Sequence, residues 1–154
     1  MKTKIILSLL SLLLISGAFT EGCEEEEPKP DYITVNVTAA GNMLLKDNTT
    51  GELSCDSRIT SIPVRVDMIK AGGETFTFYA TLGPENCYIE AGPATFKLYR
   101  EQPIEVIAYT ETVLPGFTQI RASEFLSWDE VYPGKDFGET FAWEAWLRGY
   151  WLYN

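Results

Sequence analysis

The sequence contains no histidine among its 154 residues. Histidine is the side chain that most often transfers protons or binds transition metals near neutral pH. Its absence excludes nucleophilic systems of the Ser-His-Asp and Cys-His types, and the chain also lacks G-x-S-x-G and G-x-x-x-x-G-K motifs. These absences argue against hydrolase and nucleotide-binding functions, so we expect no cofactor and no enzymatic activity.

Basic residues are also few. Twelve Lys and Arg residues stand against 22 Asp and Glu residues, which gives a formal net charge of −10. We expect no nucleic-acid partner, because binding a phosphate backbone requires an excess of Lys and Arg. An anionic membrane surface would also repel this chain unless a covalent anchor held it there.

Cysteine is scarce, with three residues at Cys23, Cys55 and Cys87. Zinc would need four donors, so we expect no metal site. An odd number in an exported chain requires one cysteine with a role other than an internal bridge. We predict a structural disulfide between Cys55 and Cys87, which would stabilise the fold by about 3 to 4 kcal/mol in the chain-entropy model. Two free thiols are the alternative.

Long hydrophobic runs are absent, since none reaches the roughly 20 residues needed to span a bilayer. The longest, residues 5–15, follows two lysines and precedes the small residues Ser16, Gly17 and Ala18. This order is typical of a secretory signal. We predict that residues 1–22 form a signal peptide that is removed, leaving 132 residues with a net charge of −11. That length is sufficient for one hydrophobic core.

The pair Gly22-Cys23 follows directly. It resembles the lipobox of bacterial lipoproteins, in which a small residue precedes the cysteine that receives the lipid. The resemblance implies that Cys23 is the lipid attachment residue and that the protein is anchored in a membrane through this lipid. The lipobox pattern differs at Thr20 and Glu21, so ordinary cleavage near Ala18 with a free Cys23 is the alternative.

Four glutamates, Glu24 to Glu27, follow Cys23 and precede Pro28-Lys29-Pro30. This run is similar to the export signal of Bacteroidetes-type surface lipoproteins, where acidic residues after the lipidated cysteine direct the protein to the cell exterior. The resemblance implies a lipid-anchored outer-membrane protein exposed at the cell surface. The charge and the prolines also indicate an extended, solvated tether, which we assign to residues 23–31.

From residue 32 onward, apolar and polar residues alternate in short runs that are separated by Gly, Pro and Asn. We predict seven strands, over residues 33–38, 62–68, 75–82, 87–91, 94–99, 104–112 and 141–153. Turn signals about every 8 to 12 residues favour a two-sheet arrangement. We therefore expect residues 32–154 to form a single all-β domain, a small antiparallel β-sandwich. The pattern is similar to that of immunoglobulin-like and transthyretin-like sandwiches in bacterial surface proteins.

The last 38 residues hold 11 of the 20 aromatic residues. We predict that they end in a strand, with a helix as the alternative. We also predict that Ser123 or Ser127, the latter with Glu130 three residues on, caps a short helical turn. The tryptophans are candidate ligand-binding residues, because such rings can stack on sugars or anchor a protein partner. They are Trp128, Trp143, Trp146 and Trp151. Filling the core is the competing interpretation.

Carboxylates lie among these tryptophans, at Asp129, Glu130, Asp136, Glu139 and Glu144. Glycosidases use carboxylate pairs, although solvated surface charge is the simpler interpretation. Our leading hypothesis is a non-enzymatic surface lipoprotein that serves as a binding or accessory module of a cell-surface assembly, with an outer-membrane protein or a glycan as its partner. The alternatives are a small carbohydrate-active enzyme or glycan-binding protein that uses this C-terminal region, and a structural coat or stalk component.

Overall fold

The structure is a computed structural model that describes residues 31–131 and 140–153. Within these residues the chain forms nine strands and two four-residue helices. In chain order they are β1 (Tyr32–Asp47), β2 (Leu53–Ser54), α2 (Ser57–Thr60), β3 (Pro63–Lys70), β4 (Thr75–Thr81), β5 (Tyr88–Tyr99), β6 (Ile104–Tyr109), β7 (Phe117–Ile120), β8 (Ala122–Leu126), α3 (Trp128–Val131) and β9 (Thr140–Tyr153). The predicted all-β sandwich is confirmed.

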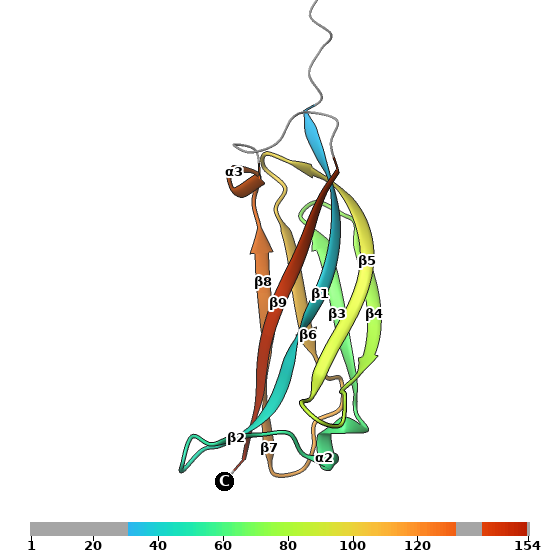
Figure 1. The fold of residues 1–154 in the computed structure, drawn as a ribbon. Helices are drawn as coiled ribbons and strands as arrows, with labels where there is room; N and C mark the ends of the chain where they lie inside the picture. The colour runs from blue at the N-terminus through green and yellow to red at the C-terminus, as the bar shows by residue number, and fades with distance from the viewer. Residues whose placement is uncertain (1–30, 132–139, 154) are drawn as a thin grey trace, which may run out of the picture.

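The strands form two sheets that pack together (Figure 1). In sheet A, β5 and β2 pair with one edge of β1, β9 pairs with its other edge, and β7 pairs with β9. Sheet B has the order β4, β3, β6, β8 and is antiparallel throughout. Sheet A is mixed, because β1 and β9 run parallel.

The parallel pair of β1 and β9 joins the two ends of the described chain along fourteen residue pairs, and the two strands run side by side in Figure 1. Two glycines permit their close approach. A Cβ atom on Gly41 would collide with the carbonyl oxygen of Leu147, and one on Gly149 would collide with the sulfur of Met43. Glycine is therefore required at both positions, because atoms of the neighbouring strand occupy the space that a Cβ atom would fill.

β7 and β8 belong to different sheets although only Arg121 separates them in the sequence. β7 pairs with β9 in sheet A, and β8 pairs with β6 in sheet B. The chain therefore crosses from one sheet to the other at this residue.

The core lies between the two sheets and is built from alternating residues of the long strands. Along β9, odd-numbered side chains face the core and even-numbered side chains face outward. The prediction of a strand rather than a helix at the C-terminus is confirmed.

β1 extends nine residues beyond the end that alternation predicts. Ala39, Ala40 and Gly41 are buried one after another, so the alternating pattern is lost there although the strand continues. A register shift between β1 and β5 begins at the same place, between Val37 and Ala39.

The interruption predicted at Gly92-Pro93 is wrong, because β5 runs through both residues. The register places them opposite Thr38 alone, which is the arrangement of a β-bulge. Gly92 has a φ of 108°, a conformation that glycine adopts readily. The strand therefore continues through the irregularity.

Cys55 and Cys87 form the predicted disulfide, with their Cα atoms 5.4 Å apart. The bridge joins the segment before α2 to the residue before β5. Beside it, the carboxylate of Asp56 caps α2 by accepting a 2.8 Å hydrogen bond from the backbone nitrogen of Arg58. Hydrogen bonds from the side chain and backbone of Arg58 lower the pKa of Asp56 to about 2.

Candidate functional site

The structure places the four predicted ligand-binding tryptophans in different environments. Trp128 and Trp151 are buried, with exposed fractions of 4% and 1%, and Trp143 is half-buried against the core. Trp146 is 43% exposed on the outer face of sheet A. Three of the four therefore contribute to packing, and Trp146 is the one that a ligand can reach.

The position of Trp146 follows from the period of the strand. Trp143 and Trp151 occupy odd-numbered positions of β9, which face the core, whereas Trp146 occupies an even-numbered position. Side chains on successive strand residues point to opposite faces of the sheet. The aromatic residues of β9 therefore share a strand and divide between its two faces.

Trp146 lies beside residues of two other strands of sheet A. It pairs with Ala40 of β1, and its ring centroid lies 6.3 Å from that of Tyr88 on β5, with the ring planes inclined at 46°. Two residues after Ala40 on β1, Asn42 pairs with Tyr88 of β5 on one side and with Arg148 of β9 on the other. We name this surface the aromatic face and define it as Asn42, Tyr88, Trp146, Arg148 and Tyr150.

Three residues of the aromatic face, together with two leucines, line a pocket of about 230 Å³. The amide nitrogen of Asn42 donates a 3.0 Å hydrogen bond to the carbonyl oxygen of Asn86, which orients the Asn42 side chain. The ammonium nitrogen of Lys46 lies 5.7 Å from the centroid of the Tyr150 ring. The lining residues are Asn42, Leu44, Leu53, Arg148 and Tyr150.

Sequence reasoning missed every member of the aromatic face except Trp146. A partial signal exists for Arg148 and Tyr150, because they share the even-numbered side of β9 with Trp146. Nothing local indicates that Tyr88 lies next to Trp146, since that contact depends on how β5, β1 and β9 pair.

The predicted carboxylates are divided between the two sheets. Glu144 is exposed on the outer side of β9, whereas Asp129 and Glu130 belong to α3, which follows β8 of sheet B. Asp136 and Glu139 lie outside the described residues. In the described part of the chain, no group of three or more His, Cys, Asp or Glu residues is placed to hold a metal ion.

Glu130 has a structural role in α3. Its carboxylate accepts hydrogen bonds from the backbone nitrogen of Ser127 at 2.7 Å and from the Ser127 hydroxyl at 3.0 Å. Both bonds run from Ser127 to Glu130, so the Glu130 side chain binds the backbone N–H of the residue before the helix, which is one half of a capping box. The predicted short helical turn after Ser127 is confirmed, whereas Ser123, the other predicted cap, lies within β8.

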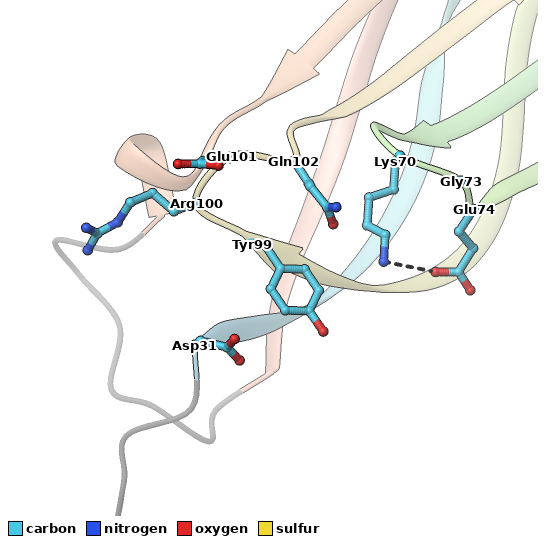
Figure 2. Close-up of a pocket in the computed structure, with 9 residues that line it drawn as sticks. Asp31, Lys70, Gly73, Glu74, Tyr99, Arg100, Glu101 and Gln102 are labelled. Atoms are coloured by element: carbon cyan, nitrogen blue, oxygen red, sulfur yellow. Dashed lines mark ion pairs between the residues drawn. The ribbon is translucent and has the colours of Figure 1, made fainter.

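A larger cavity of about 650 Å³ lies at the end of the sandwich where β1 begins (Figure 2). The turn between β3 and β4 and the turn between β5 and β6 supply most of its lining. The ammonium nitrogen of Lys70 lies 3.5 Å from the carboxylate of Glu74 and 5.3 Å from the ring centroid of Tyr99. Because this cation is already paired, we take the aromatic face as the stronger candidate.

The outer face of sheet B carries a polar cluster centred on Asp67, which is 6% exposed. Its carboxylate accepts hydrogen bonds from Arg65 Nε at 3.0 Å, Thr77 Oγ1 at 2.7 Å and the Tyr109 hydroxyl at 2.9 Å. Arg65 also donates to Glu111 at 2.6 Å. Burial would raise the pKa of Asp67, but these hydrogen bonds outweigh it and hold the pKa below its ordinary value of 3.8. The cluster is internally satisfied, which indicates a structural role.

The predicted signal peptide, residues 1–22, and the predicted lipid attachment residue Cys23 lie outside the described residues. Of the helices that the structure describes, none is long and apolar enough to cross a membrane. Comparison with protein-family models, with curated proteins and with solved structures finds no match.

Proposed function

We propose that this chain is a lipid-anchored module of a bacterial cell surface and that its sandwich domain binds a glycan through the aromatic face. The observation that carries the proposal is the position of Trp146, which is 43% exposed on a regular strand beside the ring of Tyr88. A large ring held by a rigid sheet offers a flat contact area at low cost in conformational entropy.

The neighbours of Trp146 fit the chemistry of a sugar ring. Such a ring presents apolar C–H groups on its face and hydroxyl groups around its edge, so it requires a flat aromatic surface bordered by hydrogen-bonding groups. Asn42 and Arg148 supply donors in the adjacent row of the sheet. Glu90, which pairs with Ala40, and Glu144 supply acceptors. This mixture of charges favours a neutral glycan.

A glycan fits this face better than a protein subunit does. Protein interfaces are enriched in Trp, Tyr and Arg but depleted in Glu. Here Glu144 lies two residues before Trp146 on the same side of β9, and Glu90 pairs with Ala40, the residue that pairs with Trp146. The exposed ring is therefore bordered by carboxylates, which can accept hydrogen bonds from the hydroxyl groups of a sugar.

The anchor in this proposal rests on the sequence. Gly22 precedes Cys23, and four glutamates follow it. The first strand begins at Tyr32, so a short tether would hold the domain close to the lipid. Two or three acyl chains anchor a protein stably, at about 0.8 kcal/mol per buried methylene group. Mass spectrometry of the peptide that contains Cys23 tests this point, and an unmodified thiol would contradict it.

Binding is tested by isothermal titration calorimetry of the purified full-length protein against neutral oligosaccharides built from hexose or N-acetylhexosamine units. We expect at least one oligosaccharide to bind, and we expect Trp146→Ala to weaken its binding by about tenfold or more. The matched control is Phe125→Ala, which removes an aromatic ring that is 58% exposed on sheet B. A panel without binding, or equal affinities for the wild-type protein and Trp146→Ala, would contradict the proposal.

A further inference from the structure

β4 is the end strand of sheet B, and its free edge lacks the features that usually protect such edges. Among the described strands only β3 pairs with it, and that pairing shows no register shift. The seven residues Thr75–Thr81 read TFTFYAT and contain no charge and no proline. Native proteins usually block an edge strand with lysine, proline, a bulge or a short length, because its unpaired N–H and C=O groups can bind another strand.

The other end strands carry such protection. β5 contains Glu90, Pro93 and Lys97 together with its bulge, and β8 is five residues long and contains Glu124. β7 is only four residues long and β2 only two. The unprotected edge of β4 is therefore a local property of this strand.

The side chains of β4 also leave apolar surface uncovered at this edge. Phe76 is on the core-facing side of the strand, where its ring contacts that of Phe96 at 5.2 Å between centroids, yet it remains 37% exposed. Phe78 is half-buried on the same side, and Tyr79 is 62% exposed on the outer side. A further strand at this edge would cover Phe76 and Phe78.

We propose that β4 pairs antiparallel with β4 of a second copy of this chain, with Phe78 opposite Phe78. This register is the one that pairs all seven residues and keeps the core-facing side chains of both copies on the same side of the joined sheet. It places Thr75 opposite Thr81 and Thr77 opposite Tyr79, which are favourable cross-strand pairs. This inference is independent of glycan binding, because the aromatic face lies on sheet A.

The charges next to β4 support a second copy as the occupant. In this register Glu74 of one copy stands opposite the buried, uncharged Leu82 of the other, so no like charges meet along the edge. The two copies contribute the same uncharged strand, and the contact closes by two-fold symmetry without leaving a free β4 edge.

The paired segment is short, about 23 Å at roughly 3.3 Å per residue. Such a contact is smaller than a standard protein interface, so we expect weak association in dilute solution. Antiparallel pairing places the N-terminal ends of the two copies at opposite ends of the joined sheet, so one membrane accommodates the pair with its strands lying along the membrane surface. This step rests on the lipid anchor proposed above, which would raise the effective concentration of the two copies.

Disulfide cross-linking in membranes tests the pairing and its register. Two copies of the full chain with different C-terminal tags are co-expressed, one carrying Thr75→Cys and the other Thr81→Cys, and the membranes are then oxidised. Directly opposite strand residues have Cα atoms about 4.5 to 5.5 Å apart, which a disulfide can span. We expect a dimer that carries both tags. The unsubstituted chain is the control for disulfides formed by Cys23.

A charge at the edge provides the second part of the test. Phe76→Lys, added to both copies, should abolish the cross-linked dimer, because two lysines would then face the joined edge. Phe125→Lys is the matched control on β8, the opposite end strand of the same sheet, and should leave the dimer unchanged. The cysteine pair decides the question by itself if Phe76→Lys fails to fold.

Three outcomes would overturn the proposal. The first is the absence of a two-tag dimer from folded protein. The second is a dimer of Thr75→Cys with itself at equal yield, which would indicate a different pairing. The third is a cross-link to another protein, which would assign the edge of β4 to a foreign strand.

Discussion

The two outer faces of the sandwich use similar residue types in different ways. On sheet B, the buried carboxylate of Asp67 accepts hydrogen bonds from three side chains around it. On sheet A, the ring of Trp146 stands 43% exposed beside Tyr88 and Arg148. Polar groups that satisfy one another stabilise a fold, whereas an exposed ring bordered by polar groups is available to a ligand. Two properties therefore distinguish a structural cluster from a candidate site. They are the exposure of the central side chain and whether the polar groups around it already form hydrogen bonds with one another.

The largest effect that tests this comparison is expected at Asp67. Asp67→Ala removes an acceptor of three hydrogen bonds and leaves the guanidinium group of Arg65 with one carboxylate partner, Glu111. We expect the free energy of unfolding to fall by about 2 to 4 kcal/mol, less than for a fully buried pair because Arg65 is 30% exposed. Urea denaturation measures this change.

Glu111→Ala is the matched control, because it removes the other carboxylate bound to the same arginine. Glu111 is 53% exposed, so we expect a loss below about 1 kcal/mol. Equal effects of the two substitutions would show that the cluster does not depend on the buried carboxylate.

A smaller effect is expected in the pH dependence of stability. The pKa of Asp67 is lowered in the folded state, so the ionised carboxylate contributes stability at pH values above its ordinary pKa of 3.8. That contribution is lost as the pH falls through the lower, folded-state pKa. The difference in unfolding free energy between the wild-type protein and Asp67→Asn should therefore shrink as the pH is lowered from 6 to 2. A constant difference over this range would contradict the assignment.

Patterns in the sequence predicted those features of the fold that depend on residues close to one another in the chain. Alternation identified six of the nine described strands, including the core-facing side of β9, but it missed the short strands β2, β7 and β8. The spacing of Ser127 and Glu130 predicted the helical turn of α3. The pairing of Cys55 with Cys87 followed from counting cysteines in a chain that was predicted to be exported. These features are visible because each depends on residues that are close in sequence or on a residue type with few roles.

Long-range pairing explains what could not be predicted. Ala40 and Trp146 meet because the first and last strands run parallel, and no local signal encodes that register. For the same reason Tyr88 was not recognised as a neighbour of Trp146, and four of the five residues of the aromatic face were missed. Asp67 lies on the polar side of the alternating pattern of β3, which gives no local sign of burial, yet partners from neighbouring strands bury it.

The smallest effect is expected from Trp146→Ala on stability, and it is the one that most sharpens the comparison. Because the ring is 43% exposed, its removal should lower the free energy of unfolding by less than about 1 kcal/mol, similar to Phe125→Ala on the other sheet. The same urea denaturation measures both. A loss of 3 kcal/mol or more would mean that Trp146 packs like a core residue, and its effect on glycan binding would then follow from a damaged fold. A small loss, together with weakened binding in Trp146→Ala alone, would assign the ring to recognition.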